Sequence, residues 1–378
     1  MRVCGGALGV FAGLILSIQG VTWCQDPPAP EAILRHALQL HQSGDIAGAI
    51  SEYRAYLNQA PDNVMARSNL GAALARAGRY QEAIVEYKKA LDLQPGNLPV
   101  RMNLSLAYYK AAEIAEAAAE FERVLAERPG EQQPTLLLAD CYLRLGENGK
   151  AIDLLSPLQE RAPDDKTIDY LLGTALIRDG QTARGQSLVD RILRDGESAE
   201  AHLLLGESKL SANDFAGAIE EFKKGLAINP ALPGLNGYYG IGLAESGDIP
   251  GAEAAFRKEL SSNPNDYSAN FQLGKLLKGD DNYVESRHCF ERALGLRPHD
   301  PAARYELALL DVEDGQTDQA RVKLESLVRE NPQDVEAHVA LATVYYRLKR
   351  KADGNKERAT VLRLNAEKHA TAAGGMSK

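Results

Sequence analysis

Prolines recur along this chain at a fixed spacing of 34 residues, and this period constrains the fold more than any other feature. One irregular step of 67 residues shows that a single residue has been lost between two units. A small residue near the middle of each unit and a large apolar residue four positions later keep the same phase. Nine consecutive units therefore have the same arrangement of small and large apolar residues. The prolines are Pro61, Pro95, Pro129, Pro163, Pro230, Pro264, Pro298 and Pro332.

Each unit has the pattern of two amphipathic helices joined by a turn. Large apolar residues recur at spacings of three and four, as at Leu70 and Leu74 and again at Ile84, Tyr87 and Leu91. Glycine or asparagine at the fifteenth position predicts a left-handed helix end. Small residues at the eighth and twentieth positions, such as Gly71 and Ala83, leave room for two helix backbones to approach.

Each proline predicts the end of a second helix, and an aspartate after it predicts the cap of the next helix. The capping residues expected on this basis are Asp62, Asp164, Asp266, Asp300 and Asp334.

The period and its side chains resemble the tetratricopeptide repeat, a 34-residue helix–turn–helix unit. Leu-Gly pairs begin at Leu70, Leu172, Leu205 and Leu273, with relaxed versions at Leu104, Leu138 and Leu307. The resemblance implies an all-α fold, a right-handed superhelical α-solenoid over residues 30–348 in which each unit packs on its neighbours. The expected repeats are 30–63, 64–97, 98–131, 132–165, 166–198, 199–232, 233–266, 267–300 and 301–334, followed by the first helix of a tenth.

Segments of different composition flank the array. Residues 1–24 are expected to be a signal peptide and 25–29 a linker, while 349–369 should form a capping helix and 370–378 a disordered tail. Within the array, the fifth unit lacks its proline, so its second helix should end differently. The seventh unit, with Gly237, Gly240 and Gly242, should be the softest, although close packing of small residues would also explain its glycines.

The leader carries Arg2 and then no charged residue until Asp26. We expect the leader to be cleaved and the mature protein to be periplasmic or secreted, in a bacterium. Lipidation at Cys24 and an uncleaved anchor are the alternatives. Cleavage leaves 42 basic and 52 acidic side chains, a net charge of −10, which argues against nucleic acid as a partner. It also leaves two distant cysteines, Cys141 and Cys289, which are expected to be core residues rather than a disulfide.

No nucleophile with its base, metal-ligand cluster or phosphate-binding loop stands out from the repeat pattern. The seven histidines are scattered, without metal-ligand spacing. We therefore expect a non-enzyme with no metal and no cofactor.

The resemblance places ligands in a concave groove lined by the first helices. The thirteenth position is basic in four successive units, and these cations could hold an acidic or carboxylate-ended peptide. A cation in the last turn of a helix also complements the helix dipole without any ligand, so both interpretations stay open. The candidate peptide-binding residues are Asn69, Arg76, Met102, Asn103, Tyr109, Lys110, Arg144, Tyr170 and Arg178.

Phe271 and Tyr305 could form a second, aromatic contact zone, or they could pack against neighbouring units. The paired lysine motifs of the family's peptide-carboxylate clamp are not present in register, so that activity is not expected.

We expect a scaffold or adaptor that binds proteins or peptides in an extracytoplasmic assembly, without a stable membrane span once the leader is removed. Two alternatives remain open. One is an accessory subunit that positions the substrate of a partner enzyme. The other is an architectural component that associates with itself.

Overall fold

The computed structural model describes residues 29–194 and 196–375 of the chain. The expected signal peptide, most of the linker and the last three residues of the expected tail lie outside these ranges. Within them the structure contains only helices, α1 to α20, connected by turns.

The helices form consecutive antiparallel pairs, with one pair in each expected repeat. The pairs of the first five repeats are α1 (Pro30–Ser43) and α2 (Ile46–Gln59), α3 (Val64–Arg76) and α4 (Tyr80–Leu93), α5 (Leu98–Lys110) and α6 (Ile114–Glu127), α7 (Gln132–Leu145) and α8 (Asn148–Arg161), and α9 (Lys166–Arg178) and α10 (Thr182–Leu193).

The second part of the array continues this arrangement to the end of the described chain. Its pairs are α11 (Ala199–Ser211) and α12 (Phe215–Ile228), α13 (Leu235–Glu245) and α14 (Ile249–Ser262), α15 (Tyr267–Gly279) and α16 (Tyr283–Leu296), α17 (Pro301–Glu313) and α18 (Thr317–Glu330), and α19 (Val335–Arg347) and α20 (Lys351–Gly375).

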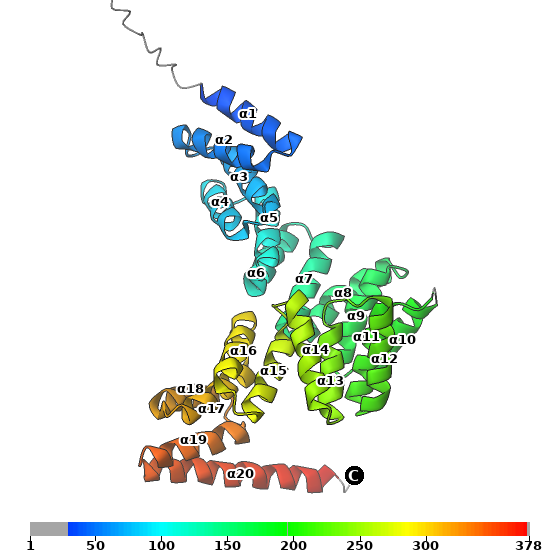
Figure 1. The fold of residues 1–378 in the computed structure, drawn as a ribbon, viewed down its shortest axis with the longest axis vertical. Coiled ribbons are helices and arrows are strands. Elements are labelled where there is room, and N and C mark those ends of the chain that lie inside the picture. Colours follow the sequence, from blue (N-terminus) through cyan, green and yellow to red (C-terminus); the bar gives the residue numbers. More distant parts are fainter. Residues whose placement is uncertain (1–28, 195, 376–378) are drawn as a thin grey trace, which may run out of the picture.

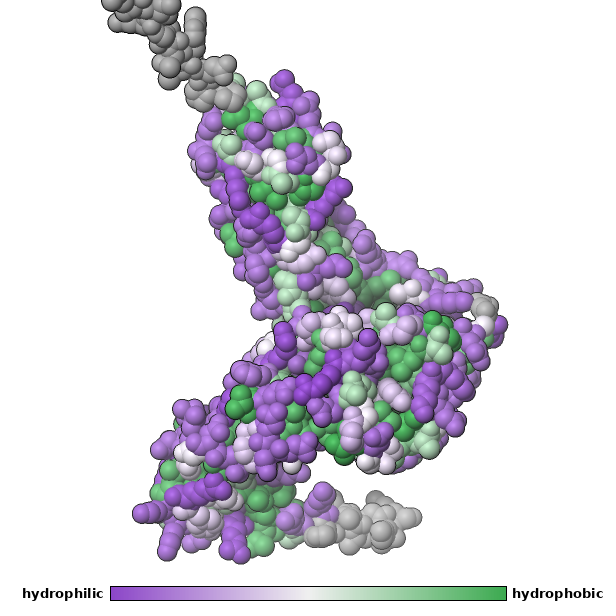
Figure 2. All heavy atoms as spheres, viewed as in Figure 1, coloured by the Kyte–Doolittle hydropathy of each residue, from purple (hydrophilic) through white to green (hydrophobic). Residues whose placement is uncertain are grey.

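Each helix packs mainly on the helices directly before and after it, and the whole array curves (Figure 1). The α-solenoid expected from the period is therefore confirmed. The blue α1 and the red α20 lie at opposite ends, and α7 to α14 form the wide middle part. Hydrophilic side chains cover much of the visible surface, with apolar side chains between them in smaller groups (Figure 2).

The core is built from the large residue that each unit carries four positions after its small central residue. Tyr53, Phe121, Phe222, Phe256 and Phe290 are fully buried. In four units this ring lies directly over the glycine at the eighth position. At Gly206, for example, an added Cβ would stand only 2.2 Å from the ring of Phe222. The small residue thus accommodates an aromatic ring as well as a neighbouring backbone. The same contact recurs at Gly71 with Tyr87, Gly240 with Phe256, and Gly274 with Phe290.

The observed helix ends and helix caps match those expected from the sequence at most positions. The expected glycines at the fifteenth position and Asn213 have positive φ, and Ala112, Asp281 and Lys349 adopt the same conformation there. Asp266, Asp300 and Asp334 cap α15, α17 and α19 as expected. Two caps were assigned one residue too early. Asn63 and Asp165 accept the capping hydrogen bonds of α3 and α9 in place of Asp62 and Asp164.

The two irregular units behave differently from each other. The fifth unit's second helix, α10, is shortened to 12 residues and ends at Leu193. In the seventh unit, Gly237, Gly240 and Gly242 are buried within α13, which supports the packing explanation for these glycines. The last helix also departs from expectation, since α20 continues to Gly375, beyond the predicted limit of 369.

Candidate functional site

The four cations of the thirteenth position lie in the last turns of α3, α5, α7 and α9, where they complement the helix dipoles. Their surroundings divide them into two pairs. Arg76 and Lys110 are exposed, and no carboxylate of the described residues lies within ion-pair distance of either. Arg144 and Arg178 instead form ion pairs and lie close to the middle of the array. The four cations are therefore of two kinds, an exposed unpaired pair and an ion-paired pair.

Arg144 joins two repeats through a closed set of three contacts. Its Nε donates to Asp140 Oδ2 at 2.7 Å, and its Nη2 donates to the Tyr109 hydroxyl at 3.0 Å. That hydroxyl in turn donates to Asp140 Oδ2 at 2.7 Å. The guanidinium also lies over the Tyr109 ring, 5.0 Å from its centroid. Arg144 is thus held in place while 44% of its side chain stays exposed.

Arg178 makes a bidentate ion pair with Glu207, in which Nε and Nη2 each donate over 3.0 Å. Its guanidinium lies 5.3 Å from the centroid of the Tyr238 ring. Burial acts to lower the pKa of Arg178, but the Glu207 carboxylate outweighs this effect and holds the pKa well above the ordinary value. Because Glu207 is only 4% exposed, Arg178 neutralises a buried charge and connects α9, α11 and α13.

A third arginine reaches the same place from the other half of the chain. Arg297, which ends α16, donates from Nε to the carbonyl oxygen of Arg144 over 2.7 Å. Its guanidinium lies 3.8 Å from the centroid of the Tyr267 ring. Burial lowers the pKa of Arg297, and no carboxylate of the described chain is within ion-pair distance of it. It is thus a half-buried cation that forms no ion pair with any described carboxylate.

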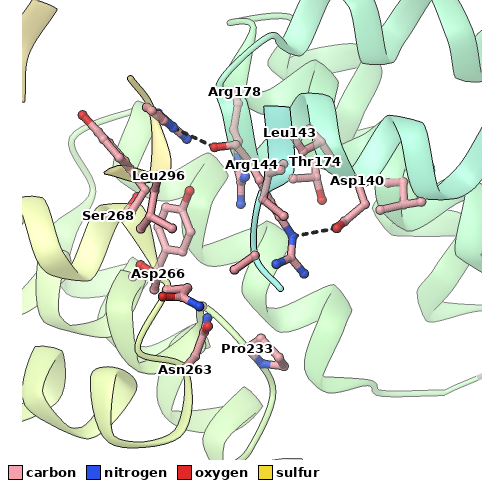
Figure 3. Close-up of a pocket in the computed structure, with 18 of the residues that line it drawn as sticks. Asp140, Leu143, Arg144, Thr174, Arg178, Pro233, Asn263, Asp266, Ser268 and Leu296 are labelled. Atoms are coloured by element: carbon pink, nitrogen blue, oxygen red, sulfur yellow. Dashed lines mark hydrogen bonds and ion pairs between the residues drawn. The ribbon is translucent and has the colours of Figure 1, made fainter. Parts of the chain in front are cut away.

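These three arginines line a pocket of about 280 Å³. Figure 3 shows Arg144 and Arg178 at this pocket. Residues of α7 and α9 line one side, and the loops before α13 and α15 line the other. Asp266 lies within the pocket and also caps α15, and burial raises its pKa. The pocket therefore combines cations, aromatic rings and amides. Its polar and aromatic lining consists of Asp140, Arg144, Tyr170, Thr174, Arg178, Tyr238, Asn263, Asn265, Asp266, Tyr267, Ser268 and Arg297.

The structure brings together only some of the predicted site residues. Arg144, Tyr170 and Arg178 line the pocket, and Tyr109 contacts Arg144 beside it. Five others lie on α3 and α5 and do not line it, namely Asn69, Arg76, Met102, Asn103 and Lys110.

The two secondary aromatic candidates pack within the array. Phe271 stacks on Tyr267 at a centroid distance of 5.8 Å and meets the edge of Phe290 at 5.6 Å. Tyr305 is partly buried against the core of the last repeats. Their contact with a partner stays a prediction.

The repeat pattern did not indicate the lining residues from the second half of the array. Asn263 and Arg297 share one position of the unit, 34 residues apart, but Tyr238 and Asp266 occupy two other positions, so no single register connects the four. They meet α7 and α9 only because the solenoid curves back on itself.

Other chemistry is limited in the described part of the chain. Cys141 and Cys289 are buried free thiols, and burial raises their pKa values to about 12 and about 11. Among the described residues, no group of three or more potential metal ligands comes together. Within the same ranges, every helix is too short or too polar to cross a membrane.

Three solved structures were compared with this chain, and the first of them has a similar fold. The APC/C hetero-tetramer Cut9–Hcn1 has a TM-score of 0.55 at 12% identity, covering 90% of this chain and 88% of that chain. The human IFIT1 dimer with m7Gppp-AAAA has a TM-score of 0.49 at 16% identity, with coverages of 90% and 91%. MamA has a TM-score of 0.40 at 22% identity, with coverages of 44% and 97%. At such identities, the likeness to Cut9–Hcn1 concerns the fold alone.

A search of curated protein sequences finds no relative of this chain. Two family models, both described as tetratricopeptide repeat, do match it. One covers residues 34–97, 170–233, 240–301 and 305–354, and the other covers residues 110–174. Together with the helix pairs and the period of the sequence, these matches show that the chain belongs to the tetratricopeptide repeat family.

Proposed function

We propose that this protein is a non-catalytic scaffold that binds an acidic or carboxylate-ended segment of a partner protein in the pocket between α7, α9, α13 and α15. Tetratricopeptide repeat arrays bind proteins or peptides, which supports the general role. The observation that carries the specific proposal is Arg297, because this half-buried side chain lines the pocket and forms no ion pair among the described residues.

The charges around the pocket favour an anionic group at one particular place. Arg144 and Arg178 already bind Asp140 and Glu207, so a ligand would have to compete with these ion pairs. Arg297 uses Nε for the carbonyl of Arg144 and forms no ion pair among the described residues. A carboxylate of the partner would therefore bind best at Arg297, since a charge-assisted hydrogen bond is about twice as strong as a neutral one.

Photo-crosslinking in intact cells tests this proposal. A photoreactive residue at Asn265, which is exposed and lines the pocket, should capture a defined segment of a partner. The same residue at Val284, which is 74% exposed and does not line the pocket, serves as the control. Capture from Asn265 should fall at least fivefold in Arg297→Gln. Equal capture at both positions, or capture unaffected by Arg297→Gln, would contradict the proposal.

We also propose that the scaffold works outside the cytoplasm. The support is the leader of residues 1–24, with Arg2 followed by an uncharged apolar stretch. N-terminal sequencing of the mature protein tests this directly. A chain that starts close to Gln25 agrees with cleavage, whereas a chain that retains Arg2 argues for an anchor or for a cytoplasmic location.

A further inference from the structure

A recurrent contact joins the two helices of several repeats to the loop before them. The fourth residue of the unit binds a carboxylate 19 residues later and the carbonyl of the proline six residues earlier. Arg67 donates to Glu86 over 2.8 Å and to the carbonyl of Pro61 over 2.8 Å. Arg101 donates to Glu120 over 2.7 Å and to the carbonyl of Pro95 over 2.8 Å. In both of these joints between a helix pair and the loop before it, one arginine donates hydrogen bonds to two acceptors.

The last unit has a histidine at this place. His338 Nδ1 lies 2.6 Å from Glu357 Oε2, and its Nε2 lies 3.2 Å from the carbonyl oxygen of Pro332. A carboxylate and a carbonyl only accept hydrogen bonds, so both ring nitrogens need a hydrogen to satisfy them. The imidazolium form therefore reproduces what the guanidinium does at Arg67 and Arg101. If Glu357 carried the extra proton instead, the number of bound protons would be the same.

A second histidine provides an internal comparison. His202 also occupies the fourth position, and its Nδ1 lies 2.8 Å from Glu221. The fifth unit has no proline, and the buried Nε2 of His202 has no hydrogen-bond partner among the described residues, since Oε2 of the exposed Glu197 lies 4.0 Å away, beyond hydrogen-bond distance. Lys209 and Lys224 already pair with Glu221. A neutral His202 therefore satisfies its one acceptor, and this joint needs no additional proton.

The charged groups on the elements around α19 leave His338 with one acidic partner. Of all described carboxylates, Glu357 on α20 is the one within ion-pair distance of the imidazole, which is 8% exposed. The other groups are engaged elsewhere. On α18, Glu325 binds Arg321 and the Tyr345 hydroxyl. In the turn before α20, Arg350 binds Asp353 and lies over the Tyr345 ring. On α19 itself, Asp334 caps the helix. Burial raises the pKa of Tyr305 on α17, and the negative charges of Glu336 and Asp334 add to this effect.

We propose that docking of α20 onto α19 takes up one proton at the pair His338–Glu357. A docked state that binds one more proton than the undocked state gains stability as pH falls. Below the ordinary pKa of imidazole, near 6.5, the C-terminal cap keeps this stability in full, and a rise in pH above that value removes it and loosens the cap. Loosening exposes the buried side chains Leu341, Tyr345 and Leu364, so the end of the array becomes available to another apolar surface.

Hydrogen exchange on the full mature chain tests this proposal. The opening of residues 355–366 is measured between pH 5.5 and 8.0, with each rate corrected for the intrinsic exchange rate at that pH. The population of the open state should rise by up to about tenfold per pH unit, the limit for one linked proton. Residues of α11 and α12 around His202 should show no comparable dependence. A flat profile for α20 would overturn the proposal.

Two variants separate the histidine from other titrating groups. His338→Arg copies the joints of Arg67 and Arg101 and should keep α20 docked, with less than a twofold change across this pH range. His338→Asn copies Asn270, which donates to the carbonyl of Pro264, and should give a looser but equally flat profile. If either folded variant retains the wild-type pH dependence, the proton belongs to another group and the proposal is wrong.

Nuclear magnetic resonance of the histidine rings gives an independent measurement on the wild-type chain, with His338→Asn identifying the signal. With α20 docked at pH 7.5, where a free imidazole is mostly neutral, the proposal requires the His338–Glu357 pair to hold the extra proton. A neutral imidazole tautomer beside an ionised Glu357 would overturn it.

Discussion

Nε of Arg297 donates a hydrogen bond of 2.7 Å to the carbonyl oxygen of Arg144, although 153 residues separate them. This contact joins the end of α16 to the last turn of α7. It thus connects two parts of the solenoid that are four units apart and closes one side of the pocket. A local change at Arg297 should therefore affect both the shape of the array and the binding of a ligand.

The first prediction concerns this closing contact. Arg297→Met keeps an unbranched apolar side chain but removes the guanidinium with its charge and its donors. We expect a loss of about 1 kcal/mol in the free energy of unfolding, the usual contribution of one hydrogen bond, and an increase in the radius of gyration. Small-angle X-ray scattering and urea unfolding measure the two effects. Arg292→Met, an exposed change on the same helix, is the control and should leave both values unchanged.

The second prediction distinguishes the two kinds of cation at the thirteenth position. Arg178→Met leaves the carboxylate of Glu207 buried without its partner and should cost about 2 kcal/mol, since part of the Arg178 side chain is exposed. Arg76→Met at an exposed position should cost less than about 0.5 kcal/mol. Urea denaturation at pH 7 compares them, and equal midpoints would contradict the structural role of Arg178.

This difference determines how the groove can be tested for binding. Reversal of all four cations to glutamate would place a second carboxylate against Glu207 and would destabilise the array at Arg178. A loss of partner capture would then have two explanations. Reversal of Arg76 and Lys110 alone tests binding without this complication, because neither forms an ion pair within the described residues.

The period of the sequence was sufficient to predict the helix pairs, because Pro95 and its equivalents end the second helices and the fifteenth residues take positive φ. Such features depend on contacts within one unit or between neighbours, and they recur in most units of the array. The pocket depends on contacts between units four apart. Arg297 approaches Arg144 only through the accumulated curvature of the units between them, and no local pattern encodes that curvature.

The same limit explains the smaller errors. Asn63 and Asp62 are both good capping residues, and only the backbone angles of the loop decide which one caps α3. The contact of Phe222 with Gly206 was also not predictable from spacing alone, since the pattern showed that a small residue is required but not which neighbour requires it.

The third prediction concerns pH and the buried acid Glu259. This side chain is 1% exposed and accepts a hydrogen bond of 2.7 Å from the amide of Gly234 at the edge of the pocket. Burial raises its pKa, an effect that the amide of Gly234 partly offsets. The native state therefore binds more protons than the unfolded state at this site. Its contribution to stability rises as pH falls from the raised native pKa toward the ordinary value near 4.3.

Glu259→Gln should remove this contribution to the pH dependence, because the amide oxygen can still accept from Gly234 and carries no charge. We expect the variant to be at least as stable as the wild type at pH 7. Thermal unfolding between pH 4.5 and 7.5 measures the change, with the exposed Glu127→Gln as control. If both variants follow the wild-type pH profile, Glu259 does not titrate in this range.

The fourth prediction uses two glycines that both lie within helices but have different surroundings. A methyl group at Gly206 would stand 2.2 Å from the ring of Phe222, which is fully buried and cannot move without disturbing its neighbours. We expect Gly206→Ala to lower the free energy of unfolding by about 1–3 kcal/mol, the usual cost of overpacking. Gly295 in α16 has no atom within 4 Å of the added carbon, so Gly295→Ala should raise stability by about 0.5–1 kcal/mol through its better helix propensity. Chemical denaturation of the two variants provides the comparison. Because the substitution is the same at both sites, effects of opposite sign can arise only from their surroundings, and effects of equal sign would contradict the ring-over-glycine packing that repeats along the array.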